Sequence, residues 1–187
     1  MPQAQPDLQT RTSTLADGRT VVTRRVHAPA DDVWSVLADG WRYANWVVGA
    51  SRIREVDPQW PEPGSRLHHS IGVWPALIDD HTEVLTADPG HGLLLKARGW
   101  PAGEARIRIK VTGVGTHGSV VSIAEDATGG PGRLIPRRAR QLLITPRNTE
   151  ALRRLALIAE GRHKDDQRAA PPSSHPADLA PTLRRSG

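Results

Sequence analysis

The chain has 187 residues, of which 37% are hydrophobic and 24% are charged, and this length suits one domain with a single core. No uncharged stretch is long enough to span a membrane, and the first residues lack a secretory signal, so we expect a cytoplasmic protein. The absence of cysteine excludes disulfide frameworks, thiolate metal sites and cysteine nucleophiles.

The formal net charge of +5 is concentrated in one segment. Between Arg133 and Arg154 there are seven arginines and a single acidic residue, Glu150. A basic segment of this kind is a weak indication of nucleic acid or an anionic surface, and a solvated helix face is the ordinary alternative.

The two ends differ in composition from the middle. Residues 1–18 are polar and contain Pro2 and Pro6, so we expect a flexible N-terminal arm. Residues 163–187 are rich in Pro, Ala and Arg, which predicts a disordered tail. The segment 19–162 remains, and its length suits a single domain.

The domain begins with a strand and two helical segments. Residues 20–28 predict the strand. A helix follows, with Asp31 and Asp32 in its first turn, where carboxylates favour the positive end of the helix, and Gly40 ends it. A second short helical piece ends at Gly49.

From residue 51 the apolar pattern changes to period two. Short connections rich in Gly and Pro separate the alternating runs, which favours an antiparallel meander. The expected strands are 51–56, 65–73, 76–86, 93–99, 104–111 and 120–126.

After the glycine-rich segment 129–132 the pattern becomes helical again. A short basic piece comes first, and Asn148 is then predicted to cap a helix that Gly161 ends. One face of this helix is apolar, with Leu152 and Leu155 at helical spacing. It is the only long amphipathic element that could cover the apolar face of the sheet.

Four stretches in this order carry a resemblance to a known group of proteins. They read VHAPADDVWSVLADGWRYANWVVG, WPEPGSRLHHSIGVWP, DDHTEVLTADPGHGLLLKAR and RNTEALRRLALIAE. The chain resembles the SRPBCC superfamily, also called START-like or birch-pollen-allergen-like, and within it the bacterial polyketide cyclase/dehydrase-like branch. The resemblance implies an α+β helix-grip fold, in which a curved antiparallel sheet of about six to seven strands wraps a long C-terminal helix around a hydrophobic cavity. It also implies lipids, polyketides or sterols as ligands, but no catalytic motif runs across the family.

Alternation along the strands predicts which side chains line that cavity. In 104–111 the apolar residues oppose charged ones, and the apolar set is expected to face inward. Tryptophans near strand ends suit the wall of a cavity mouth, although ordinary packing explains them equally well. The predicted ligand-binding residues are Trp46, Leu67, Ile71, Trp74, Thr82, Val84, Leu95, Trp100, Ile107, Ile109, Val121, Ile123 and Leu152.

Two polar residues are predicted to share the inner face. A hairpin centred on Val73 and Ala76 places His69 directly opposite Asp80. A carboxylate beside an imidazole fixes its tautomer and raises its basicity, as general acid–base chemistry on a carbonyl compound requires. A register slip of one residue would bring His81 in instead. The alternative interpretation is a cross-strand pair that only anchors the sheet.

Alternation brings Glu125 onto the same inner face. Burial favours the protonated form of a carboxyl group, which would make Glu125 a proton donor. His69, Asp80 and Glu125 are therefore the candidate catalytic residues, expected to form one small polar cluster in an apolar cavity.

Other motifs point to no cofactor or metal. Residues 113–118 match G-x-G-x-x-G, but a predicted strand follows where a nucleotide-binding fingerprint needs a helix, so we expect a hairpin turn. His68 and His69 are adjacent and point to opposite faces of the sheet, so they cannot chelate together. No helix-turn-helix or RNA-binding pattern is visible, which argues against nucleic acid as a partner.

Three functions follow from these observations. The first is binding of a hydrophobic small molecule in an internal cavity that opens by motion of residues 131–147. The second is a cofactor-independent cyclase, aromatase or dehydratase that uses the acid–base residues named above. The third is association with nucleic acid or an anionic membrane through the segment Arg133–Arg154. The sequence leaves the ligand and the oligomeric state open.

Overall fold

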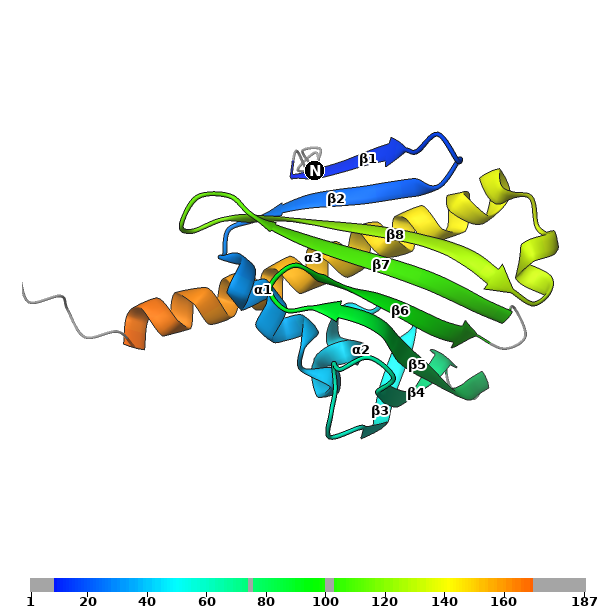
Figure 1. Cartoon of the computed structure of the whole chain (residues 1–187), viewed down its shortest axis with the longest axis horizontal. Coiled ribbons are helices and arrows are strands. Elements are labelled where there is room, and N and C mark those ends of the chain that lie inside the picture. Colours follow the sequence, from blue (N-terminus) through cyan, green and yellow to red (C-terminus); the bar gives the residue numbers. More distant parts are fainter. Residues whose placement is uncertain (1–8, 74–75, 100–102, 170–187) are drawn as a thin grey trace, which may run out of the picture.

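Eight antiparallel strands form one curved sheet in the computed structural model, which describes residues 9–73, 76–99 and 103–169. The strand order is β1-β2-β8-β7-β6-β5-β4-β3. The strands are β1 (Thr10–Thr14), β2 (Thr20–Val26), β3 (Ala50–Val56), β4 (Arg66–Val73), β5 (Ala76–Asp88), β6 (Gly92–Gly99), β7 (Gly103–Gly113) and β8 (Ser119–Gly129). Figure 1 shows the long helix α3 behind this sheet.

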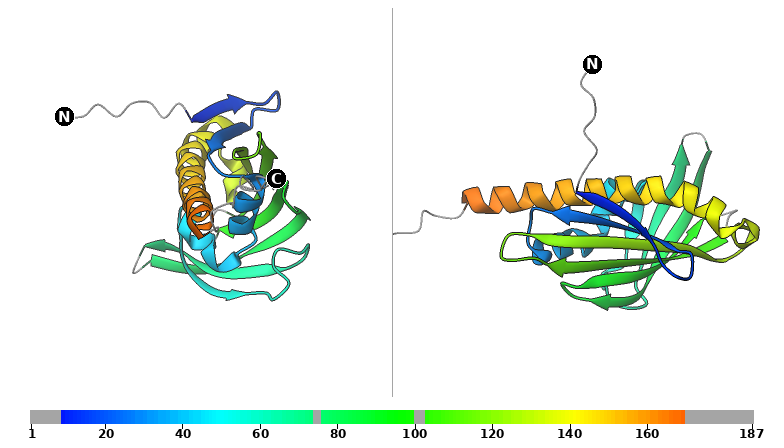
Figure 2. Two further views of the ribbon diagram at one scale, coloured as in Figure 1. Left: turned by 90° about the vertical axis from the view of Figure 1, so that its left-hand side faces the viewer. Right: turned by 90° about the horizontal axis from the view of Figure 1, so that it is seen from above.

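The helices gather on the concave side of the sheet. They are α1 (Ala30–Leu37), the 3₁₀ turn η1 (Gly40–Arg42), α2 (Tyr43–Trp46), the 3₁₀ turn η2 (Pro131–Leu134) and α3 (Arg137–Ala169). In Figure 2 the sheet bends around α3, and α1 and α2 lie between the helix and the far strands. This arrangement is the α+β helix-grip fold expected from the sequence. Among the described residues, no helix is both long and apolar enough to cross a bilayer.

Alternating burial explains how the sheet holds the core. On β7 the buried residues Ile107 and Ile109 alternate with the exposed Arg106 and Arg108, so one face is apolar and the other is charged. Leu155 of α3 is fully buried in the same hydrophobic core as Ile107 and Ile109. The core therefore lies between the concave face and the inner side of α3.

The N-terminal segment expected as a flexible arm contains the eighth strand. Residues 10–14 pair with β2 as β1, in a hairpin that runs from Thr10 opposite Arg24 to Thr14 opposite Thr20. β1 is polar and largely exposed, so it has no hydrophobic alternation that would reveal a strand in the sequence. Its pairing comes from backbone hydrogen bonds to β2 instead.

The prediction for the start and end of the last helix was wrong. α3 begins at Arg137, so Asn148 is buried inside the helix and does not cap it. Gly161 also lies within the helix, which continues to Ala169 beyond the expected boundary at residue 162. A helical glycine costs only about 1 kcal/mol relative to alanine, and contacts with α1 and β2 hold α3 in place.

The sheet register agrees with the predicted hairpins. β4 and β5 pair with His69 opposite Asp80, so the inner-face prediction for these two residues is confirmed and the slipped register with His81 is not formed. The glycine-rich residues 113–118 connect β7 to β8 in a hairpin, as expected.

Candidate functional site

A small cavity lies between the concave face of the sheet and α3. Its volume is about 20 Å³, which is room for roughly one water molecule. The walls are mostly apolar, but four polar side chains reach them. The lining residues are Tyr43, Trp46, Val47, Val48, Leu95, Ile107, Ile123, Glu125, Arg147, Asn148 and Ala151.

An ion pair between the sheet and the helix forms one side of this cavity. Glu125 projects inward from β8 and is only 5% exposed. The Arg147 guanidinium, on α3, pairs with its carboxylate. The Gln141 side-chain amide donates to the Glu125 backbone carbonyl at 3.1 Å, which is a second contact between α3 and Glu125. A buried carboxylate needs such a partner, because taking an unpaired charge out of water costs several kcal/mol.

A chain of three polar side chains begins at Tyr43, which also lines the cavity. The Tyr43 hydroxyl lies 3.2 Å from the Thr82 hydroxyl, and Thr82 Oγ1 lies 3.0 Å from His69 Nε2. All three residues are buried, and the rings of Tyr43 and His69 are 5.5 Å apart. The chain therefore runs from the cavity wall at Tyr43 into the sheet at His69.

Burial changes the acidity of both ends of this chain. Desolvation lowers the pKa of His69 to about 4, although the negative charge of Asp80 acts in the opposite direction. Desolvation also raises the pKa of Tyr43. At neutral pH the imidazole of His69 is therefore uncharged and Tyr43 keeps its proton.

Among the described residues, two buried ring nitrogens have no hydrogen-bond partner. They are Nδ1 of His69 and Nε1 of Trp46. Trp46 lines the cavity, and its indole ring packs edge-on against Tyr43 with centroids 5.3 Å apart. An unsatisfied buried donor is costly, so a polar atom of a bound molecule at Trp46 would be stabilising.

A larger hollow lies outside the space between the sheet and α3. It is an open groove of about 400 Å³ beside α1, bordered by Trp41, Trp60 and Arg162. The Trp60 indole donates to the Leu37 carbonyl at 3.3 Å, so this tryptophan has a structural role.

The sequence of this chain matches a family. Residues 17–160 match the family described as polyketide cyclase / dehydrase and lipid transport. The chain belongs to this family. No curated protein matches the sequence.

Solved structures of low identity share the fold of this polyketide cyclase/dehydrase family member. The Zhui aromatase/cyclase from Streptomyces sp. R1128 is 17% identical, with a TM-score of 0.59 and coverage of 82% of this chain and 95% of that chain. The di-domain ARO/CYC StfQ from the steffimycin biosynthetic pathway is 16% identical, with a TM-score of 0.59 and coverage of 76% of this chain and 51% of that chain. Ara h 8.0201 is 11% identical, with a TM-score of 0.55 and coverage of 83% and 99%. These likenesses show the helix-grip fold of the SRPBCC superfamily.

In this family member the three candidate catalytic residues do not form one cluster. Glu125 lies on β8 and pairs with Ile107 of β7, which pairs in turn with Leu95 of β6. Two strands therefore separate Glu125 from β5, which carries Asp80. Three strand spacings correspond to about 14 Å along the sheet. Glu125 therefore belongs with Arg147, and it is an ion-pair acceptor, not the isolated buried acid expected from the sequence.

Asp80 is buried beside His69, but its carboxylate points to a different partner. The Asp80 side chain accepts a hydrogen bond from the backbone amide of His81 at 2.8 Å. His69 uses Nε2 to contact Thr82, and its Nδ1 has no partner within the described part of the chain. The hydroxyl of Thr82, not the carboxylate of Asp80, orients this imidazole.

The predicted ligand-binding residues fall into three groups. Four of them line the cavity, namely Trp46, Leu95, Ile107 and Ile123. The next group is buried in the core away from the cavity: Leu67, Thr82, Val84, Ile109, Val121 and Leu152. Ile71 is only half-buried, and Trp74 and Trp100 lie outside the described residues.

Sequence reasoning identified Glu125 but missed the other three polar residues of the cavity wall, Tyr43, Arg147 and Asn148. Tyr43 is the only tyrosine in the chain, which was a signal, but it sits on a short helix with no strong pattern. Arg147 and Asn148 were assigned to the basic segment and to a helix cap. No group of three or more metal-ligating side chains gathers within residues 9–73, 76–99 and 103–169.

Proposed function

We propose that this protein binds a hydrophobic small molecule with a carbonyl or similar oxygen atom between the sheet and α3. One observation carries this proposal: Tyr43 and the Glu125–Arg147 pair face the same apolar cavity. Two apolar side chains in place of the ion pair would give a fold that is at least as stable, so the pair is better explained by binding than by stability. Apolar walls give most of the affinity in such sites, and a few polar groups orient the ligand. The family and the aromatase/cyclase neighbours support a polyketide-like or lipid-like ligand.

The cavity must expand to accept this ligand. A volume of about 20 Å³ is far below the roughly 300–1,000 Å³ of small-molecule sites. Arg147 and Asn148, which form one wall of the cavity, come directly after Pro146 in α3. Pro146 has no N–H to donate the backbone hydrogen bond that this position in the helix requires. We propose that residues 131–147 move away from β8 at this point when the ligand enters.

The hydrogen-bond chain defines which atom Tyr43 offers to the ligand. Nδ1 of His69 has no partner among the described residues, and a buried bare lone pair costs less than a buried unpaired N–H. We therefore place the proton on Nε2, which donates to Thr82 Oγ1. The Thr82 hydroxyl then donates to the Tyr43 oxygen, and the Tyr43 O–H is free to donate to a ligand oxygen.

The test uses 1-anilinonaphthalene-8-sulfonate, a planar apolar probe with an anionic group that Arg147 would contact. We expect saturable fluorescence enhancement with one site per chain. The Arg147→Gln variant should bind the probe about tenfold more weakly, while Arg147→Lys keeps most of the affinity. Arg154→Gln is the matched control, because Arg154 lies two turns further along α3 and pairs with Glu150.

Equal probe affinity in Arg147→Gln and in the parent protein would contradict the proposed site. Circular dichroism at the same temperature distinguishes this result from partial unfolding, which would increase probe fluorescence in the variant. Native mass spectrometry of the purified protein then identifies any ligand that stays bound.

A second candidate function is a cofactor-independent dehydratase or cyclase. It is favoured by two groups on the same cavity wall, the Tyr43 hydroxyl, which can donate to a leaving hydroxyl, and the Glu125 carboxylate, which can accept a proton. Loss of water from a β-hydroxy ketone needs a base to remove the proton beside the carbonyl and a donor to the leaving hydroxyl, and it needs no oxidant. The test follows formation of the conjugated ketone from a β-hydroxy aryl ketone. If catalysis occurs, Tyr43→Phe should lower the rate by about 10²-fold with probe binding retained.

A further inference from the structure

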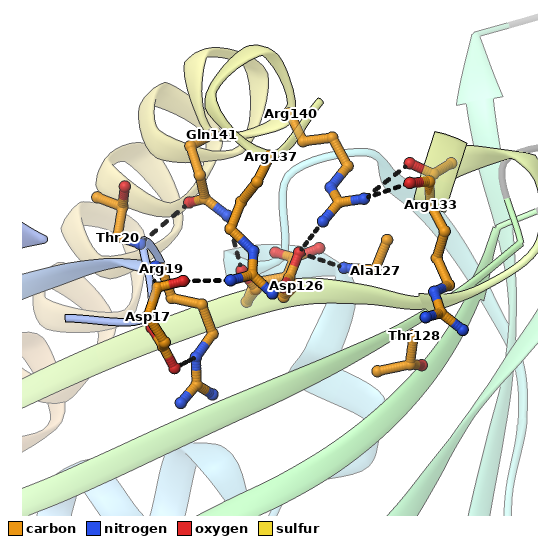
Figure 3. A network of polar contacts seen from close by, with 12 residues as sticks. Asp17, Arg19, Thr20, Asp126, Ala127, Thr128, Arg133, Arg137, Arg140 and Gln141 are labelled. Carbon is orange, nitrogen blue, oxygen red and sulfur yellow. Dashed lines mark hydrogen bonds and ion pairs between the residues drawn. The ribbon is translucent and has the colours of Figure 1, made fainter. Parts of the chain in front are cut away.

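The first turns of α3 have their polar side against the protein. Arg137 and Arg140 both contact the Asp126 carboxylate, at 3.0 and 2.8 Å. Gln141 accepts from the Thr20 amide at 3.3 Å and is 6% exposed. Figure 3 shows these three side chains directed from α3 toward β8 and β2. The contact between this part of the helix and the sheet is therefore made by ion pairs and hydrogen bonds.

Large apolar side chains in these first turns, and just before them, face solvent. Leu134 is 86% exposed, Ile135 is 45% exposed, and Leu142 and Leu143 are each 75% exposed. Arg138, Ala139, Leu142 and Leu143 recur at intervals of three and four residues, so they lie on one side of α3. A soluble helix normally buries its leucines and exposes its arginines, and here the order is reversed. We call the exposed residues Leu134, Ile135, Arg138, Leu142 and Leu143 of this segment, together with Arg133, the outer patch.

Charge indicates what would cover the outer patch. Residues 131–149 contain five arginines and no acidic residue. Arg137, Arg140 and Arg147 are paired with carboxylates of β8, whereas Arg133 and Arg138 form no ion pair with any described residue. Exposed leucines beside unpaired arginines are the combination that lies in the interface of an anionic bilayer, with apolar side chains among the acyl chains and guanidinium groups on the phosphates.

Other partners fit this surface less well. Nucleic acid would pair with the arginines but leave four large apolar side chains in water. A second copy of the chain packed through the same patch would bring Arg133 and Arg138 close to their own copies without a compensating acid. We propose that the outer patch docks this protein on an anionic lipid bilayer, with Leu142 and Leu143 inserted among the lipids.

The test is sedimentation of the full chain with vesicles. We expect binding to vesicles of phosphatidylcholine and phosphatidylglycerol in equal parts, and little binding to phosphatidylcholine alone. The double substitution Leu142→Ser/Leu143→Ser should weaken binding at least about tenfold, as should Arg133→Gln/Arg138→Gln. All four side chains are exposed and outside the polar contacts with β8, so the fold should be retained, which circular dichroism checks.

Matched controls come from the remote end of α3 and from the sheet. Leu157→Ser changes a leucine that is 53% exposed, and Arg106→Gln changes an exposed arginine on the convex face of β7. Both should leave vesicle binding unchanged. The proposal is overturned if the parent chain does not bind the anionic vesicles, or if the patch variants bind them as tightly as the controls. It is also overturned if the patch variants instead change the oligomeric state or the binding of a DNA duplex and leave vesicle binding intact.

Discussion

Arg147 of α3 forms an ion pair with Glu125 of β8 inside the grip, one residue after Pro146 interrupts the hydrogen-bond ladder of the helix. The contact joins the moving part proposed above to the middle of the sheet. It also places a guanidinium and a carboxylate on the wall of a cavity whose other walls are mainly apolar. Stability, opening and ligand recognition therefore depend on the same pair of side chains.

We expect Arg147→Gln to lower the free energy of unfolding by about 2 kcal/mol, because it leaves the Glu125 carboxylate buried without its cation. The double substitution Glu125→Gln/Arg147→Gln should recover most of that loss. Urea denaturation of the single and double variants measures this coupling. Additive losses in the double variant would show that the pair contributes nothing beyond its separate side chains.

We expect Thr82→Val to lower the free energy of unfolding by about 1–3 kcal/mol. The substitution removes the hydroxyl between Tyr43 and His69, so two buried polar groups lose their partner at once. Thr86→Val on the exposed side of β5 is the control and should change stability by less than about 0.5 kcal/mol. Equal effects of the two substitutions in thermal or urea unfolding would contradict the role given to Thr82.

We expect stability to fall as the pH is lowered from 6.5 to about 4, with a contribution from His69. Its pKa is depressed to about 4 in the folded protein, so the unfolded chain binds the proton first, and folding loses up to about 3 kcal/mol across this window. Above pH 6.5 this contribution is constant. His69→Gln should remove it, so urea denaturation at several pH values should give a flatter profile for the variant. Parallel profiles would place the acid sensitivity elsewhere.

We expect Pro146→Ala to stabilise the first turns of α3. Alanine restores a backbone donor within the helix and removes the steric conflict of the proline ring, a gain of about 1–3 kcal/mol for local opening. Amide hydrogen exchange in residues 137–146 should slow, and uptake of the naphthalene sulfonate probe should slow with it. Unchanged exchange in this segment would mean that Pro146 does not define the point of opening.

The amino-acid sequence by itself determined the fold class and much of the inner surface. The alternation of Ile107 and Ile109 with arginines sets which face of β7 is buried, because only one face of the sheet can be removed from water. The same period of two, with a tight turn, placed His69 opposite Asp80. These features are local along the chain or lie across a single hairpin, and so they are readable before folding.

Only the tertiary structure decided the composition of the site. Tyr43 meets Thr82, and Arg147 meets Glu125, across elements far apart in the sequence, and neither contact has a period or spacing that marks it. The sequence also left undecided which face of the first turns of α3 packs against the sheet, because the arginines and the leucines form two faces of similar length. The acidic residues of β8 settled it, since a guanidinium gains more from a carboxylate on the protein than a leucine gains from the polar edge of the sheet.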